Sequence, residues 1–266
     1  MLKDITIGQY YPAASRIHKL DSTTKLIATV VFMVSLFVVN KFWPYLIVTA
    51  ALLAVIKMSD IPVKYILKGI KPLRWIILFT FVINIFFLPG DPLWSFGFLS
   101  ITKQGLSQAI FMSIRLVFLV VGTSLLTLTT SPIQLTDGIE RMFNPLKKIG
   151  MPVHELAMMM TIALRFIPTL LDETDRIMKA QSARGADFVT GSIIQRAKNM
   201  IPLLVPLFIS AFRRADELAI AMEARCYRGG VNRTRMKELS ITWVDYVGIG
   251  AVLMVTAILL ALWWLN

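Results

Sequence analysis

Apolar residues gather in five runs along the chain, separated by polar segments. A helix needs roughly 20 mainly apolar residues to cross a bilayer, so the runs predict transmembrane helices. They cover residues 25–40, 44–57, 73–89, 105–128 and 243–265. Tryptophan is typical of membrane–water interfaces. Six tryptophans lie near the ends of these runs: Trp43, Trp75, Trp94, Trp243, Trp263 and Trp264.

Residues 132–240 follow a different pattern. More than half of the chain's 28 basic and 16 acidic residues lie there, and charges interrupt its apolar stretches. We therefore expect a helical insertion outside the lipid. The sequence predicts an all-α membrane protein with about five transmembrane helices and one long cytoplasmic domain of amphipathic helices. The expected divisions are residues 1–130 with the first four spans, the domain 131–240, and the last span in 241–266.

The basic residues predict an orientation, because they concentrate on the cytoplasmic side of membrane proteins. The N-terminal segment is basic, whereas the loops after the first and third spans each contain one basic residue, Lys41 and Lys103. The loop after the second span contains five basic residues and one acid: Lys57, Asp60, Lys64, Lys68, Lys71 and Arg74. We expect a multi-pass protein of the cell membrane, with the N-terminus and residues 131–240 in the cytoplasm and the C-terminus outside.

Two long amphipathic helices are expected inside the insertion, because apolar residues recur there at helical spacing. The second begins after Ser192, which with Gln195 has the form of a capping box. The two helices are expected to pack on each other over about half of their apolar surface and to cover membrane partners or lipid with the rest. The positions expected to contact such partners are Met160, Leu164, Ile167, Leu171, Leu204, Phe208 and Ala211.

Three prolines lie within these predicted helices. Proline removes a backbone donor and clashes with the preceding turn. Pro168 should therefore kink the first helix or divide it in two, and Pro202 and Pro206 should interrupt the first half of the second. All three are candidate points of bending.

Composition agrees with a membrane protein. Hydrophobic residues make up 56% of the 266 residues and charged residues only 17%, whereas a soluble domain carries about a quarter charged residues. The net charge of +12 is explained by basic residues on the cytoplasmic side, so nucleic acid is not expected as a partner.

The chain lacks the motifs of several enzyme classes. It has no Gly-x-x-x-x-Gly-Lys-Ser/Thr phosphate loop and no Gly-x-Ser-x-Gly nucleophile motif, and His18, His154 and Cys226 do not form a metal-ligand cluster. Carboxylates are nearly absent from the predicted spans, which disfavours an ion-coupled carrier. Arg115 lies near the middle of the fourth span. It is either a contact for a substrate or partner, or a structural arginine bonded to backbone inside the bundle.

The two predicted helices of the insertion end alike. The first ends in "SARGAD" at Arg184, and the second ends in "EARCYRGG" at Arg225. An arginine near a helix C-terminus followed by glycine is also the chemistry of ordinary capping. The repetition favours a second interpretation, in which small neighbours let each helix end enter a groove where the guanidinium meets carboxylates.

An ordered set of segments resembles the T component of energy-coupling factor (ECF) transporters over nearly the whole chain. The segments are "HKLDSTTKL" at 18–26, "LTTSPIQLTD" at 128–137, "ALRFIP" at 163–168 and the two arginine motifs. The resemblance implies an ATPase-coupling role for each motif. Ala183, Arg184 and Gly185 match the first in full; Ala224 and Arg225 match the second, but Cys226 stands where glycine is common.

The resemblance also implies a function and partners. The chain would be a non-catalytic scaffold that transmits the motion of two cytoplasmic ATP-binding-cassette ATPases, expected to be a heterodimer, to one membrane S component that binds a vitamin or another micronutrient. ATP and Mg²⁺ would be bound by the ATPases, and no cofactor or metal is expected in this chain. The membrane subunit of another ABC importer and a stand-alone secondary transporter are the alternatives.

Overall fold

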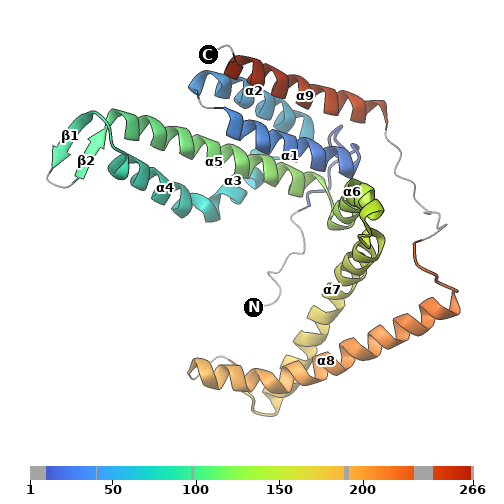
Figure 1. The fold of residues 1–266 in the computed structure, drawn as a ribbon. Helices are drawn as coiled ribbons and strands as arrows, with labels where there is room; N and C mark the ends of the chain where they lie inside the picture. The colour runs from blue at the N-terminus through green and yellow to red at the C-terminus, as the bar shows by residue number, and fades with distance from the viewer. Residues whose placement is uncertain (1–9, 40, 97–98, 189–191, 231–241, 265–266) are drawn as a thin grey trace. The chain divides into compact units, whose positions relative to one another are not determined.

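The computed structural model describes residues 10–39, 41–96, 99–188, 192–230 and 242–264. Within these ranges the chain is almost wholly helical (Figure 1), which confirms the all-α membrane class. The described residues form two compact units, 10–141 with 242–264, called the bundle unit below, and 142–230, called the helix-pair unit. The boundary between the units thus falls at Met142, whereas the sequence-based division is at residue 131. The division predicted at residues 240–241 lies outside the described residues.

The bundle unit contains most of the apolar helices, with the last two residues of α6 across its boundary. They are α1 (Ser22–Val38), α2 (Phe42–Ser59), α3 (Val63–Ile70), the short 3-10 helix η2 (Lys71–Leu73), α4 (Arg74–Phe87), α5 (Lys103–Thr129), α6 (Pro132–Phe143) and α9 (Trp243–Trp264). α1 packs against α9 and α5, and α4 lies along α5. Leu36, Val48 and Leu259 are almost fully buried in the core of this unit.

Five segments in the described part of the chain are long and apolar enough to cross a membrane. They are Phe42–Ser59, Val63–Phe87, Lys103–Thr129, Val153–Ala183 and Trp243–Trp264. Four of them overlap spans predicted from sequence. The first predicted span corresponds to α1, a shorter apolar helix of 17 residues. Val153–Ala183, which sequence analysis assigns to the insertion, qualifies because its first half is rich in methionine and leucine and its charges gather in the second half.

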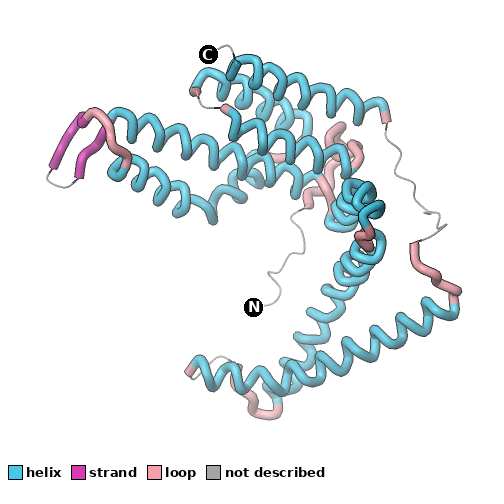
Figure 2. The backbone as a smooth tube through the Cα atoms, in the orientation of Figure 1, coloured by secondary structure: helices cyan, strands magenta, loops and turns pink. Residues whose placement is uncertain are grey.

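A two-stranded hairpin between α4 and α5 departs from the all-helical expectation. β1 (Pro92–Phe96) pairs antiparallel with β2 (Leu99–Thr102), and these are the strands of the described chain (Figure 2). Thr102 joins the hairpin to the helices: its hydroxyl donates to the Leu88 carbonyl oxygen and accepts from the Gly105 N–H. A Cβ at Gly105 would lie 2.9 Å from two carbonyl oxygens of α4, so glycine allows the two helices to approach closely.

The helix-pair unit contains η3 (Asn144–Ile149), α7 (Val153–Ala183) and α8 (Ile193–Ala224). Ser192 caps α8, as predicted, by accepting from the Gln195 N–H. Of the two outcomes predicted for Pro168, a kink or a division, the division is excluded because α7 continues through it; the predicted interruption at Pro202 and Pro206 is wrong, because α8 continues through both. A proline costs about 3 kcal/mol in a helix interior, and the remaining hydrogen bonds of a long helix can offset that. Bending at the prolines stays a prediction.

Candidate coupling site

The C-terminal ends of α7 and α8 have the same backbone structure. Arg184 is the C-cap residue that follows α7, and the N–H groups of the next two residues bond back to Ser182 and Gln181. Arg225 is equivalent in α8, with the two following N–H groups bonded to Glu223 and Met222. This is the Schellman arrangement, which satisfies the last carbonyl groups of a helix.

The residue after each arginine has a left-handed backbone. Gly185 has φ 90° and Cys226 has φ 54°. Only glycine adopts this conformation without steric cost, and for other residues it costs roughly 1–2 kcal/mol. The departure from glycine at Cys226 therefore leaves the turn intact but adds strain.

Both arginine side chains are exposed. No described residue accepts a hydrogen bond from either guanidinium. Each cation lies at a helix C-terminus, where the helix dipole stabilises positive charge by a few tenths to about 1 kcal/mol. Ala183 and Ala224 directly before them are exposed as well, so a partner can reach each tip. Docking of these tips stays a prediction from sequence.

An ion pair joins the two helices at matching positions. The Arg214 Nη2 atom donates to Glu173 Oε2 at 2.7 Å, and both side chains are half-buried. Arg184 follows Glu173 by eleven residues, and Arg225 follows Arg214 by eleven. With a rise of 1.5 Å per residue, each arginine lies about 16 Å along its helix from the ion pair. The tips are thus equidistant from the point where α7 and α8 are linked.

Sequence analysis missed this correspondence, although a signal for it exists. Shifted by 41 positions, the segments 175–184 and 216–225 both contain aspartate, two alanines and arginine at equivalent places. The ion-paired residues Glu173 and Arg214 are separated by the same 41 positions. Comparing the two helices at this offset would have shown that Glu173 and Arg214 occupy equivalent positions with opposite charges.

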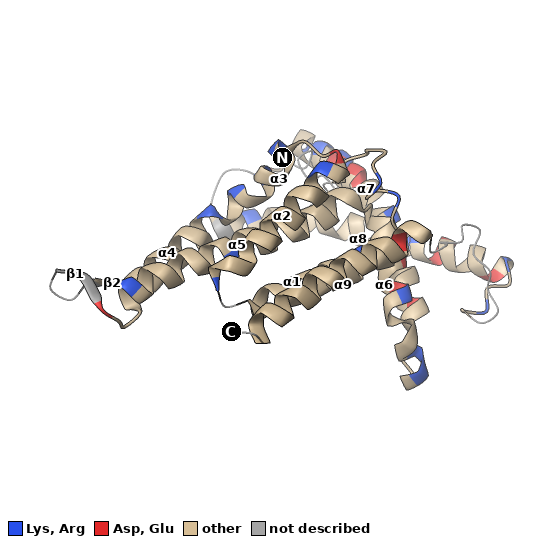
Figure 3. Ribbon diagram, turned by 90° about the horizontal axis from the view of Figure 1, so that it is seen from above, with Lys and Arg blue, Asp and Glu red and all other residues tan. Residues whose placement is uncertain are grey.

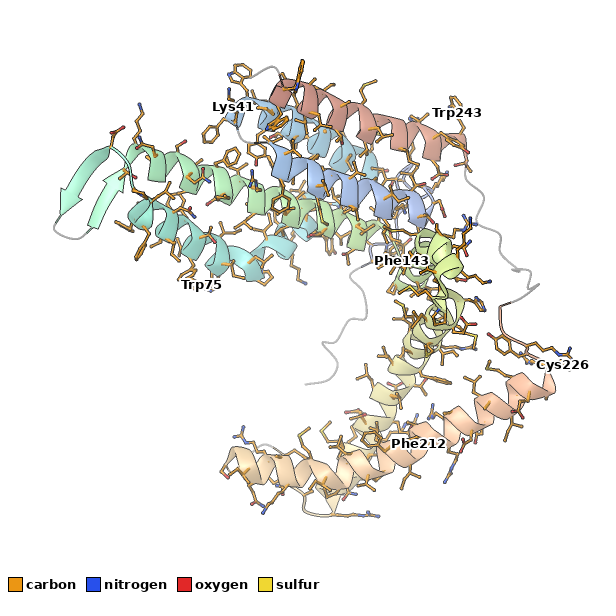
Figure 4. The ribbon with its side chains drawn as sticks, in the orientation of Figure 1. Lys41, Trp75, Phe143, Phe212, Cys226 and Trp243 are labelled. Atoms are coloured by element: carbon orange, nitrogen blue, oxygen red, sulfur yellow. The ribbon has the colours of Figure 1, made fainter. Side chains whose placement is uncertain are left out.

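Apolar side chains form an exposed stripe along α8, called the α8 stripe below. Its members are between 43% and 66% exposed: Ile201, Leu204, Val205, Phe208, Ile209 and Phe212. Phe212 projects from the helix in Figure 4. Arg214 and the buried Leu203 are three helical turns apart, so they lie on the same side of α8 as each other. This side differs from that of the stripe, and through Arg214 it faces α7.

The predicted partner-contact positions are divided between exposed and half-buried sites. Leu204 and Phe208 belong to the α8 stripe, and Met160 and Ile167 are exposed on α7. Leu164, Leu171 and Ala211 are half-buried. The helix pair therefore buries part of its apolar surface and leaves the rest uncovered.

Arg115 has a structural role in the bundle unit. It is only 9% exposed; its Nη2 donates to the Val39 carbonyl oxygen at 2.7 Å and its Nε donates to the Tyr45 hydroxyl at 3.2 Å. The guanidinium also lies over the Phe111 ring, 4.9 Å from its centroid. Of the two interpretations from sequence, these contacts support the arginine bonded to backbone inside the bundle.

A buried polar cluster brings together the segments at 18–26 and 128–137. The ammonium group of Lys25, buried at 6% exposure, donates to the Thr129 and His18 carbonyl oxygens. Asp245, at 1% exposure, accepts from the Asp21 N–H at 2.7 Å and from both the N–H and hydroxyl of Thr242. Asp21 lies 3.5 Å from Arg141 of α6 in an ion pair.

Replacing Asp245 by asparagine is expected to destabilise the bundle unit by about 2 kcal/mol. An amide has one accepting oxygen instead of two, so its NH2 group would face a buried N–H donor that the carboxylate now satisfies. The midpoint of thermal unfolding in detergent measures the loss. Asp60→Asn is the control, since Asp60 is exposed with φ 53° and asparagine tolerates that backbone. Equal midpoints for the two variants would contradict a structural role for Asp245.

Together, the apolar candidate spans and the exposed amphipathic helix pair define a polytopic α-helical membrane protein. The model of the cobalt transport protein family matches residues 13–237. The energy-coupling factor transporter transmembrane proteins EcfT of Ruminiclostridium cellulolyticum and Clostridium kluyveri are each 58% identical to the chain, covering 98% and 99% of both sequences respectively. The EcfT of Bacillus subtilis is 47% identical over 97% of the chain and 98% of its own length. The chain belongs to this family of energy-coupling factor transporter transmembrane proteins.

Proposed function

We propose that the chain is the T component of an ECF transporter, which couples two cytoplasmic ABC ATPases to a membrane S component. The similarity to the EcfT proteins supports the T-component role. The observation that most supports the coupling role is the pair of matched arginine tips, which have the same backbone turn and the same separation from the Glu173–Arg214 ion pair. Two equivalent tips suit two homologous ATPases.

The proposed mechanism is mechanical. ATP binding draws the two ATPases together, and Arg184 and Arg225 follow because charge-assisted hydrogen bonds hold each guanidinium to carboxylates of an ATPase groove. The Glu173–Arg214 ion pair links α7 and α8, so movement of the tip of one helix changes the position of the other helix. Pro168, Pro202 and Pro206 are the candidate bending points. The contact between the α8 stripe and the S component then changes, and the S component is tilted in the bilayer or released.

The chemistry is divided among the subunits. ATP and Mg²⁺ belong to the ATPases, which we propose form a heterodimer, and substrate specificity belongs to the S component. This chain is the non-catalytic link, and the cargo class is vitamins or other micronutrients. The N-terminus and residues 131–240 face the cytoplasm and the C-terminus lies outside, in agreement with the distribution of basic residues.

Affinity purification of the tagged full chain from its own cells in mild detergent tests the proposal. We expect mass spectrometry to find two ABC ATPases and one S component per copy of this chain, and liposomes to take up substrate only with the whole complex. Uptake by the chain alone would instead indicate a secondary transporter. Two copies of the chain per ATPase pair would indicate another kind of ABC importer.

A further inference from the structure

Helix α3 has a basic face opposite the face that packs into the bundle unit. Ile66 is 2% exposed and Ile70 packs against the same core. Lys64 and Lys68 of α3 and Lys71, the C-cap of α3 and first residue of η2, lie within about 60° of one another around the helix axis, on the opposite side from the two isoleucines. All three lysines are exposed, so the packing of α3 fixes this face outward.

The charge around α3 is almost all of one sign. Residues 57–74 contain five basic side chains, and Asp60 is the single carboxylate. Blue segments gather along α3 and the start of α4 in Figure 3. None of the three lysines forms an ion pair with a described residue. The three lysines are therefore not neutralised by an ion pair within the described chain.

Apolar side chains flank the lysines. Val63 and Leu67 are 55% and 56% exposed, and they lie between the lysine face and the buried isoleucines. Trp75 is 66% exposed, with the Arg74 guanidinium 5.4 Å from the centre of its ring, and it points away from α5 in Figure 4. Exposed apolar and basic side chains on one amphipathic helix are typical of helices that lie at a membrane surface.

The position of α3 in the chain also favours the membrane surface. It follows α2, a candidate span, and begins the candidate segment Val63–Phe87, in which Pro72 of η2 separates it from the apolar α4. The helix is thus held where one span ends and the next begins. Lysine stems can extend along apolar surface while the ammonium groups reach the headgroups.

We propose that the basic face formed by Lys64, Lys68 and Lys71 binds the headgroups of anionic phospholipids in the cytoplasmic leaflet. The choice of leaflet rests on the orientation given under the proposed function. The flanking Val63 and Leu67 favour lipid over an acidic protein surface. Apolar side chains beside the lysines can enter the boundary between the acyl chains and the headgroups, while the ammonium groups reach the headgroups.

The test uses the full chain reconstituted in nanodiscs of phosphatidylcholine and phosphatidylglycerol, with lipid retained per chain after detergent extraction measured by mass spectrometry. The wild type should retain phosphatidylglycerol preferentially. Each lysine near an anionic surface contributes roughly fivefold in lipid affinity. The preference of the K64Q/K68Q/K71Q variant for phosphatidylglycerol over phosphatidylcholine should therefore be at least tenfold weaker than that of the wild type. The K64R/K68R/K71R variant should keep the preference.

K147Q/K148Q/K198Q is the matched control, since it removes three exposed lysines of the helix-pair unit. It should retain phosphatidylglycerol as the wild type does. Equal retention by the K64Q/K68Q/K71Q variant, or an equal loss in the control, would overturn the proposal. So would a K64Q/K68Q/K71Q variant that keeps the lipid but no longer copurifies the ATPases, which would assign the face to a protein partner. Because the lipid measurement needs no ATPase, its failure is distinguishable from failure of the proposed function.

Discussion

The R184A/R225A double variant is expected to lose both its ATPases and substrate uptake. Removing one partner from a buried, hydrogen-bonded charge pair costs about 2–5 kcal/mol. Each single change should weaken the complex, but the other tip would still hold one ATPase close. With both tips changed this bivalent retention is lost, so the double variant should be far worse than either single one. Copurification in mild detergent and uptake in cells measure the effect.

The chain itself should tolerate these changes. The Schellman hydrogen bonds at both helix ends are made by backbone groups, and both arginines are exposed, so the midpoint of unfolding should change little. Arg165 and Arg213 are also exposed on α7 and α8, which makes R165A/R213A the matched control. A double variant R184A/R225A that still copurifies stoichiometric ATPases and supports normal uptake would refute the coupling role.

Substitutions at the two residues with left-handed backbone, Gly185 and Cys226, distinguish docking of the helix tips from ordinary helix capping. Gly185→Ala places a Cβ on a backbone with φ 90°, at a roughly 1 kcal/mol cost, although no other atom lies within 4 Å of that Cβ position. Cys226→Gly should relieve strain at the second tip. If capping alone explained the motifs, Gly185→Ala would impair the complex more than Arg184→Ala does; the coupling role predicts the reverse.

The parts of the fold that depend on local pattern were predictable from sequence. Long apolar runs specify α2, α4, α5 and α9 because span length is set by the bilayer, and Ser192 marks the start of α8 because its hydroxyl caps the helix. The glycine after Arg184 likewise indicates the end of α7. These features need only neighbouring residues.

Features that depend on distant contacts were not predictable in the same way. Asp21 and Asp245 are 224 residues apart, and no periodicity links them. The close approach of α4 and α5 at Gly105, beside the β1–β2 hairpin, joins residues about 20 positions apart. The backbone at Cys226 is left-handed although the residue is not glycine, because the hydrogen bonds of the turn impose that conformation.

The L204E/F208E variant is expected to lose the S component while keeping the ATPases. Both positions belong to the exposed α8 stripe, so the unbound chain can hold the carboxylates in water. An apolar interface would desolvate them without partners, at a cost of several kcal/mol for each. Copurification of each subunit, compared with the wild type, separates loss of the S component from loss of the ATPases.

Q195E/R213Q is the matched control, because it changes the net charge by the same two units at exposed positions on the polar side of α8. It should keep all partners. This pair of variants also distinguishes the two functions proposed for the helix pair, since the stripe and the Arg225 tip lie on the same helix but are proposed to contact different subunits. If L204E/F208E instead released the ATPases and kept the S component, the assignment of the stripe would be wrong, and α8 would have to contact the ATPases along its length rather than at its tip.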